Sequence, residues 1–299
     1  MKKLFFRSIF FSIPFLLCGL ILILIDPFNY FNYSDVIPED LKVKISKPLN
    51  YALWKVIEFE RSPEENIFLG DSRVAGLDLN AVKDYSGLKF YDFAYGGGNT
   101  REIISTFWFA ASLIKLKNVY IGLNFSIYNG FNIRDRVKDA LTKLDNPFLY
   151  LTNLNTLEAA YYLLRASVLG EKISVEQPDM SKEEFWKFKL KEAVNRYYAN
   201  YLYPDSFYKE LKEISDYCEK NNINLVFMIM PVHTDLQQMV SKYKLTDEYK
   251  VYLNDLNSLG PVFNFNIPNE FTTDRENFRD PFHIKNDILS KIMKTMWVN

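Results

Sequence analysis

The chain has 299 residues, of which 48% are hydrophobic, enough for one large domain or for a domain with an insertion. Its 36 Lys and Arg residues nearly balance its 37 Asp and Glu residues, which gives a formal net charge of −1. The chain therefore lacks the basic excess of nucleic-acid-binding proteins, and we expect no nucleic-acid partner. A disulfide between Cys18 and Cys218 is not expected, because Cys18 lies in an apolar N-terminal run.

The N-terminus has the pattern of a membrane-spanning helix. Lys2, Lys3 and Arg7 precede an uncharged run at residues 8–25 that is rich in Phe, Ile and Leu. A helix needs roughly 17–25 such residues to cross the hydrocarbon core, and cations at its start favour a cytoplasmic N-terminus. We therefore predict that residues 1–26 anchor the protein in the cell membrane, with the rest of the chain outside.

Two other interpretations of this segment are possible. A cleaved signal peptide needs small residues before the cut, and residues 20–29 contain none in the usual pattern. A lipoprotein would use Cys18, but Phe15, Leu16 and Leu17 before it are too bulky for the usual cleavage site. We therefore favour an uncleaved helix.

Residues 27–60 are interpreted as a juxtamembrane linker. Phe28, Tyr30, Phe31 and Tyr33 follow the expected helix directly. Aromatic side chains in this place fit the belt that membrane proteins form at the lipid–water interface. Packing of the same side chains within the protein is an equally good interpretation.

From residue 66 onwards, strand and helix patterns alternate. Short β-branched or aromatic runs that end in Gly, Asn or Pro are typical of buried parallel strands, and residues 100–115 and 205–220 have helical patterns. This alternation predicts an α/β domain over residues 61–299 with a mainly parallel five-stranded sheet, whose ligands bind at the carboxyl ends of the strands. The expected strands are residues 66–70, 88–94, 118–124, 223–231 and 261–265.

A mainly helical, aromatic-rich stretch at about residues 127–203 interrupts this alternation between the third and fourth strands. We interpret it as a helical insertion. Two roles fit it equally well: a lid or docking surface for the site, and additional helices that only enlarge the fold.

A serine at the end of the first expected strand is the candidate nucleophile. Ser72 lies where its hydroxyl is exposed at the rim of the sheet and where backbone N–H groups can stabilise an oxyanion. A serine needs a base, and the chain has two histidines, His233 and His283. Asp280, three residues before His283, can bond the imidazole Nδ1 from the same loop. We therefore predict a catalytic triad of Ser72, His283 and Asp280.

Two further strand ends contain candidate oxyanion donors. Residues 96–98 are consecutive glycines, which let a backbone N–H approach a reacting carbonyl closely. Asn124 follows the third expected strand, where its side-chain amide would be another donor.

The order of these motifs resembles that of the SGNH/GDSL hydrolases. Gly70-Asp71-Ser72 is similar to the family's first block, whose serine is the nucleophile, and Asp280-x-x-His283 is similar to its fifth block. Gly122-Leu123-Asn124 resembles the third block, although Phe125 replaces the aspartate that often follows it.

Residues 92–97 resemble the family's second block. Asp92 stands where the family usually has asparagine, five residues before the oxyanion glycine, so the register makes Gly97 the donor and Gly98 the close alternative. The resemblance covers about residues 66–299 apart from the insertion, and it implies a three-layer α/β/α fold. It also implies an oxyanion hole formed by the N–H groups of Ser72 and Gly97 and the side chain of Asn124.

Four residues beside these motifs are possible substrate contacts: Arg73, Gly98, Asn99 and His233. Arg73 would either hold an anionic or sugar group or form a salt bridge within the first helix. His233, after the fourth expected strand, would either contact substrate or cap the next helix. No cluster has the spacing of metal ligands, and the glycines match no phosphate-binding fingerprint, so we expect no metal and no cofactor.

The triad implies chemistry at an ester, with the acyl group passing through Ser72 to water or to a sugar hydroxyl. An anchored domain of this family resembles the partners of multispanning membrane O-acyltransferases, which acylate cell-envelope or exported polysaccharides. We therefore expect an extracytoplasmic serine O-acyltransferase, most simply for acetyl groups, with a polysaccharide substrate and such a membrane partner. The alternatives are a membrane-anchored carbohydrate esterase, and a non-catalytic scaffold that binds glycan or the acyltransferase.

Overall fold

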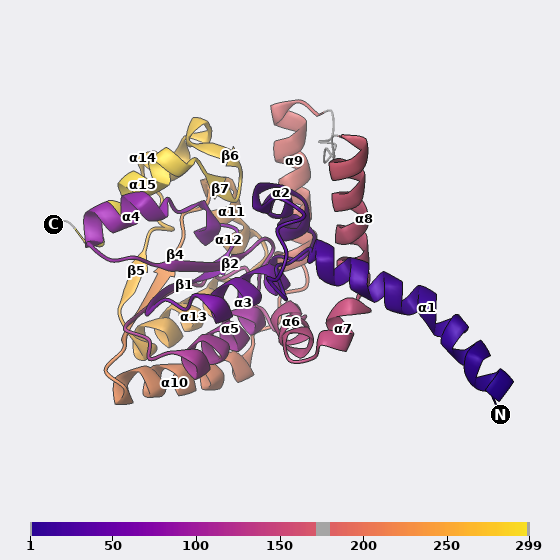
Figure 1. Cartoon of the computed structure of the whole chain (residues 1–299). Coiled ribbons are helices and arrows are strands. Elements are labelled where there is room, and N and C mark those ends of the chain that lie inside the picture. The colour runs from indigo at the N-terminus through magenta and orange to yellow at the C-terminus, as the bar shows by residue number, and fades with distance from the viewer. Residues whose placement is uncertain (1, 172–179, 298–299) are drawn as a thin grey trace. The chain divides into compact units, whose positions relative to one another are not determined.

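The structure is a computed structural model that describes residues 2–171 and 180–297 (Figure 1). Residues 172–179 of the expected insertion lie outside the described residues. The chain divides into two compact units, one helical and one α/β, and the expected insertion contributes to both. The helical unit contains residues 2–61 and 136–171, and the α/β unit contains residues 62–135 and 180–297.

The helical unit has an apolar core between three of its helices. Leu22 and Ile25 from the first helix, Ile45 from the second and Leu163 from the last described one are buried together. The helices of this unit are α1 (Lys2–Ile25), α2 (Glu39–Leu49), α3 (Tyr51–Arg61), α6 (Arg136–Leu144), α7 (Pro147–Leu151) and α8 (Leu154–Leu169).

Asp26 ends α1 and organises the chain after it. Its buried carboxylate accepts hydrogen bonds from the backbone N–H groups of residues 30–32 and from the Tyr150 hydroxyl. Tyr30 stacks on the Tyr150 ring at 4.3 Å between centroids, and the buried Phe28 contacts the same ring edge-on. Phe28 and Tyr30 therefore pack within the helical unit, whereas Tyr33 is 85% exposed.

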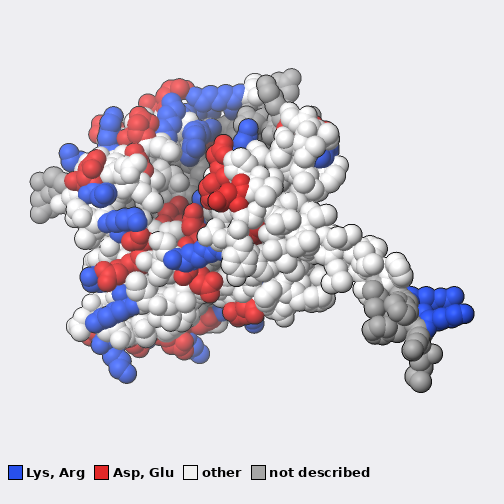
Figure 2. All heavy atoms as spheres, viewed as in Figure 1, with Lys and Arg blue, Asp and Glu red and all other residues white. Residues whose placement is uncertain are grey.

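Over residues 10–25, α1 presents no charged side chain (Figure 2). Phe11, Phe15 and Leu16 are 72%, 67% and 70% exposed. The sequence predicts a membrane span at residues 8–25. Over the residues that the structure describes, no helix combines the length and the apolar character that crossing a membrane requires.

A parallel five-stranded sheet in the order β2-β1-β3-β4-β5 forms the centre of the α/β unit, which confirms the predicted α/β class and five-stranded sheet. Alternate side chains point to opposite faces, so Phe68 and Tyr120 lie in the apolar cluster of one face. The strands are β1 (Asn66–Asp71), β2 (Tyr91–Tyr95), β3 (Asn118–Gly122), β4 (Asn224–Ile229) and β5 (Val262–Asn264).

Helices cover both faces of this sheet, which gives three layers (Figure 1). One face carries α4 (Leu79–Ser86) and α15 (Asn286–Lys294), and the other carries α5 (Thr100–Leu113), α10 (Asp205–Lys220) and α13 (Thr246–Leu259). The unit also contains α9 (Lys182–Ala193), α11 (Thr234–Gln237), α12 (Met239–Lys242) and α14 (Glu270–Thr273). Acidic and basic side chains alternate over its visible surface (Figure 2).

Two glycines allow the turn after β1 to pack closely onto the sheet. Ser72 is followed by a single 3-10 turn, Val74–Gly76, and the Val74 side chain is buried. A Cβ atom at Gly70 or at Gly122 would overlap the Val74 side chain. The turn that carries Ser72 is thereby fixed at the carboxyl ends of β1 and β3, where the strand order reverses and where ligands of such sheets bind.

Candidate active site

A short antiparallel ribbon, which the sequence analysis did not predict, carries Asp280 and His283. β6 (Phe278–Asp280) pairs with β7 (His283–Ile284), and Asp280 lies opposite His283 in this pairing. Asp280 Oδ1 accepts hydrogen bonds from the backbone N–H groups of Phe282 and His283, at 2.8 and 3.2 Å. The carboxylate thus stabilises the turn that places it beside the imidazole.

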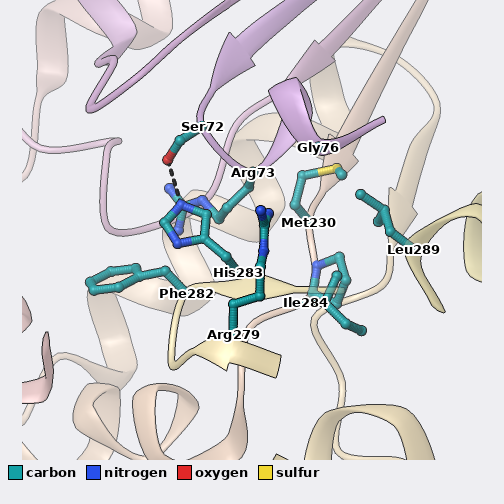
Figure 3. A pocket seen from close by; sticks show the side chains of 10 residues that line it. Ser72, Arg73, Gly76, Met230, Arg279, Phe282, His283, Ile284 and Leu289 are labelled. Carbon is teal, nitrogen blue, oxygen red and sulfur yellow. Dashed lines mark hydrogen bonds between the residues drawn. The ribbon is translucent and has the colours of Figure 1, made fainter. Parts of the chain in front are cut away.

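The structure brings together the three residues of the predicted triad, and Figure 3 shows two of them, Ser72 and His283. His283 Nε2 lies 2.7 Å from Ser72 Oγ, and His283 Nδ1 lies 2.7 Å from Asp280 Oδ2. An ionised carboxylate only accepts hydrogen bonds, so it keeps a proton on Nδ1 and leaves Nε2 to accept the Ser72 hydroxyl proton. This arrangement is the one that general-base activation of a serine requires.

Asp280 is held in its charged form. Burial opposes ionisation of its carboxyl, but hydrogen bonds from His283 and Phe282 and the charge of His283 outweigh burial and lower the pKa of Asp280 below its ordinary value. Asp280 is therefore ionised at neutral pH. It can stabilise the imidazolium that forms when His283 takes a proton.

Arg73 forms an ion pair with the residue on the other side of the nucleophile. Its guanidinium is buried and bonded to the Asp71 carboxylate through Nε, at 3.0 Å, and through Nη2. Nη1 donates to Ser126 Oγ at 3.1 Å. Of the two roles considered for Arg73, the structure shows the salt bridge, although the partner precedes the turn rather than lying in a helix. The ion pair between Asp71 and Arg73 thus links the residues directly before and after Ser72 and stabilises the turn.

Gly97 lies at the same site. It lines a cleft of about 130 Å³ together with Ser72 and His283, and its φ of +61° is a conformation that glycine adopts without steric strain. Gly98 instead packs against the end of β1, where a Cβ atom would approach Gly70 O to 3.2 Å. The structure therefore favours Gly97 over Gly98 as the backbone donor.

Asn124 has a different role from the one expected. Its Nδ2 donates to Met230 O at 2.6 Å and its Oδ1 accepts from Met230 N at 3.1 Å. The side chain is buried, and both ends of the amide are used in joining the chain after β3 to the chain after β4. Backbone groups just past the strand ends need partners outside the sheet, and an amide side chain satisfies one donor and one acceptor at once.

Replacing Asn124 with alanine is therefore expected to affect stability more than catalysis. The change leaves two buried backbone groups of Met230 without partners, which costs about 1–3 kcal/mol of unfolding free energy. Urea unfolding measures this loss, and kcat for an activated ester should fall less than about tenfold. A fall on the order of 10²–10³ in a folded variant would show instead that the amide is an oxyanion donor.

Asn99 and His233 stabilise helix starts rather than lining the site with Ser72. Asn99 caps α5, and its Nδ2 donates to Arg134 O at 2.7 Å. His233 caps α11, because Nδ1 accepts from the Asp235 N–H at 3.0 Å, while Nε2 lies 3.2 Å from Thr273 O. Both side chains are buried. For His233, the structure thus shows the second of the two expected roles.

Acidification is expected to destabilise the fold through His233. Burial is the main cause that lowers its pKa, so the unfolded chain, which titrates near pH 6.5, binds a proton that the folded histidine does not. The unfolding free energy should therefore fall as the pH drops below about 6.5 towards the lower pKa of the folded state. Urea unfolding of His233→Asn, which keeps a capping acceptor, should show a smaller fall. Equal pH dependence in both proteins would exclude His233 as the cause.

Two clefts meet at Ser72 and His283. The first, the Gly97 cleft, is also lined by Lys189 and Glu192 from α9 and by Arg196 and Tyr197 from a π-helical turn, Val194–Tyr198. The second, of about 350 Å³, is the Arg279 cleft, which is also lined by Ala75, Gly76, Asp280 and Asn286. Part of the expected insertion therefore forms a wall of the site.

No sequence motif pointed to Lys189, Arg196 or Arg279. Arg279 had a local signal, since it directly precedes the predicted acid, whereas the two others lie far from every motif. In the part of the chain that the structure describes, no group of three His, Cys, Asp or Glu side chains could hold a metal ion.

No protein-family model matches the sequence, and no curated protein matches it. A solved structure of a Bacteroides fragilis protein, provisionally described as an acylhydrolase, is 11% identical, covers 79% of this chain and 85% of its own, and has a TM-score of 0.40. A Streptococcus pneumoniae protein, provisionally described as a platelet activating factor, is 11% identical, covers 85% of this chain and 94% of its own, and also has a TM-score of 0.40. Similarity at this level carries no argument about activity or substrate.

Proposed function

We propose that the protein is a serine enzyme that transfers an acyl group from an ester through an acyl-Ser72 intermediate. The observation that carries this proposal is the pair of short contacts at His283, 2.7 Å to Ser72 Oγ and 2.7 Å to Asp280 Oδ2. They lie at the carboxyl edge of a parallel sheet, where two clefts give an ester access to the serine.

In the proposed reaction, Ser72 Oγ attacks the ester carbonyl carbon while His283 Nε2 takes the hydroxyl proton. The N–H groups of Ser72 and Gly97 hold the oxyanion. The imidazolium, which Asp280 stabilises, then gives its proton to the departing alcohol and leaves an acyl-serine. Attack by a second hydroxyl, with His283 as base again, releases the acyl group and restores Ser72.

The second hydroxyl that we propose belongs to a cell-envelope or exported polysaccharide. The protein would then be an extracytoplasmic O-acyltransferase of the SGNH/GDSL kind, most simply for acetyl groups. The order of the motifs around Ser72 and His283 supports this family. The exposed apolar surface of α1 supports attachment to the cell membrane, where a multispanning O-acyltransferase would supply the acyl group.

Removal of acyl groups from a polysaccharide is the second candidate. The open Arg279 cleft favours it, since water can reach the site and resolve the acyl-serine. Deleting the gene separates the two directions: the ester content of the envelope polysaccharide should fall for a transferase and rise for an esterase.

Trapping the intermediate tests whether the protein is an enzyme at all. After rapid acid quenching of the protein with 4-nitrophenyl acetate, mass spectrometry should find one acetyl group on the peptide that contains Ser72. Absence of this adduct in a folded protein that also releases no nitrophenolate would favour the non-catalytic scaffold.

Cell fractionation tests the proposed anchor. The full-length protein should be recovered in the membrane fraction, and a protein without residues 2–25 should be lost from it.

A further inference from the structure

Each acidic side chain that lines the two clefts beside Ser72 already has a cationic or protonatable partner. The pairs are Asp71 with Arg73, Asp280 with His283 and Glu192 with Lys189. Arg196 and Arg279 also line these clefts, and among the described residues neither has an ion pair with a carboxylate. The clefts therefore carry an excess of positive charge at the reacting serine.

Arg279 is the cation placed on the side of the serine away from Gly97. In β6 the side chains of Phe278 and Asp280 are buried while Arg279 is exposed, as alternation along a strand requires. Its Nη2 atom lies 3.9 Å from the position that a Cβ atom at Gly76 would take, so the guanidinium lies over the turn that follows Ser72. Figure 3 shows the side chain extending past the His283 ring towards this turn.

The two clefts offer separate space for the two halves of an ester. With the carbonyl oxygen beside Gly97, where a backbone N–H could hold the oxyanion, the alcohol half would extend into the Arg279 cleft. The side-chain amide of Asn286 lines this cleft together with the Arg279 guanidinium. This assignment is the same for a leaving alcohol and for an accepting one, because both occupy the same side of the acyl-serine.

We propose that Arg279 binds an anionic group, a carboxylate or a phosphate, on the alcohol half of the ester. The inference rests on the proposed acyl chemistry at Ser72 and names the substrate class of that site. A guanidinium offers forked donors that match both anions, and the neighbouring carboxylates are paired, so they oppose the anion little. The alcohol is accordingly a charged glycan unit rather than a neutral sugar.

A matched pair of esters tests the proposal: 3-carboxy-4-nitrophenyl acetate and its neutral analogue, 3-carbamoyl-4-nitrophenyl acetate. Wild-type protein should cleave the anionic ester with a kcat/KM about tenfold higher, because a hydrogen bond to a charged group is among the stronger ones. The ratio of the two kcat/KM values should fall towards one in Arg279→Gln and should be intermediate in Arg279→Lys. In the wild type it should decrease as salt is added.

Arg275→Gln is the control variant, since Arg275 is bonded to Asp235 and Glu183, and it should keep the preference. Equal rates on both esters in the wild type would overturn the proposal while leaving the acyl chemistry intact. Failure of folded protein to cleave either ester would contradict the acyl chemistry itself. Glycerol 1-phosphate and glucuronate, used as competitors of the anionic ester, distinguish phosphate from carboxylate; inhibition by neither would also overturn the proposal.

Discussion

Replacing Ser72 with alanine is expected to abolish acyl-enzyme formation and to lower kcat for 4-nitrophenyl acetate by on the order of 10⁶, as loss of the nucleophile does in other triad enzymes. The variant keeps His283 and both clefts but has no oxygen to attack the carbonyl. A fluorophosphonate probe measures the same loss directly, because it labels an activated serine.

Ser112→Ala is the matched control for this experiment. The Ser112 hydroxyl donates to Phe109 O within α5, so its removal should leave labelling and turnover unchanged. If the probe labelled the Ser72→Ala protein as strongly as the wild type, another residue would be the one that reacts. This result would remove the basis of the proposed mechanism.

Asp280→Asn should lower kcat by about 10⁴ while leaving the fold intact. The asparagine oxygen still accepts the Phe282 N–H that stabilises the turn. Its NH₂ group, however, donates towards Nδ1 and so favours the imidazole tautomer with the proton on Nε2, which faces Ser72 Oγ. His283 then cannot take the serine proton.

Nitrogen NMR of the imidazole rings checks this explanation, and with two histidines in the chain the spectrum is simple. The His283 ring should carry its proton on Nδ1 in the wild type and on Nε2 in Asp280→Asn, with His233 unchanged. The orienting role of Asp280 would be contradicted if kcat of Asp280→Asn fell less than about tenfold, or if its His283 kept the proton on Nδ1.

The sheet and the contacts around Ser72 could be predicted from the sequence for a physical reason. Strands buried on both faces must be continuously apolar, and their carboxyl ends must break with glycine or a polar residue, so both signals are local. Asp280 and His283 were found for the same reason, since their interaction spans one turn. The ribbon that carries them was missed because strands of two or three residues leave no periodic pattern.

The roles of single polar side chains could not be predicted in the same way. Asn124 was expected at the oxyanion because it follows a strand, but its partner Met230 is 106 residues away in the chain and no local pattern reveals it. The same holds for the hydrogen bond that the Tyr150 hydroxyl donates to Asp26, which lies 124 residues earlier. Long-range hydrogen bonds decide such roles, and only the folded chain specifies them.

The ribbon of β6 and β7 also determines how activity would be lost on heating. Asp280 and His283 share this ribbon, so the contact between His283 and Ser72, residues 211 positions apart, joins the two distant segments of the triad. Phe278 and Ile284 of the ribbon are buried in the same apolar cluster as Phe68 and Tyr120 of the sheet. The ribbon should therefore separate from Ser72 only when this cluster loosens, so that activity and tertiary structure are lost at the same temperature.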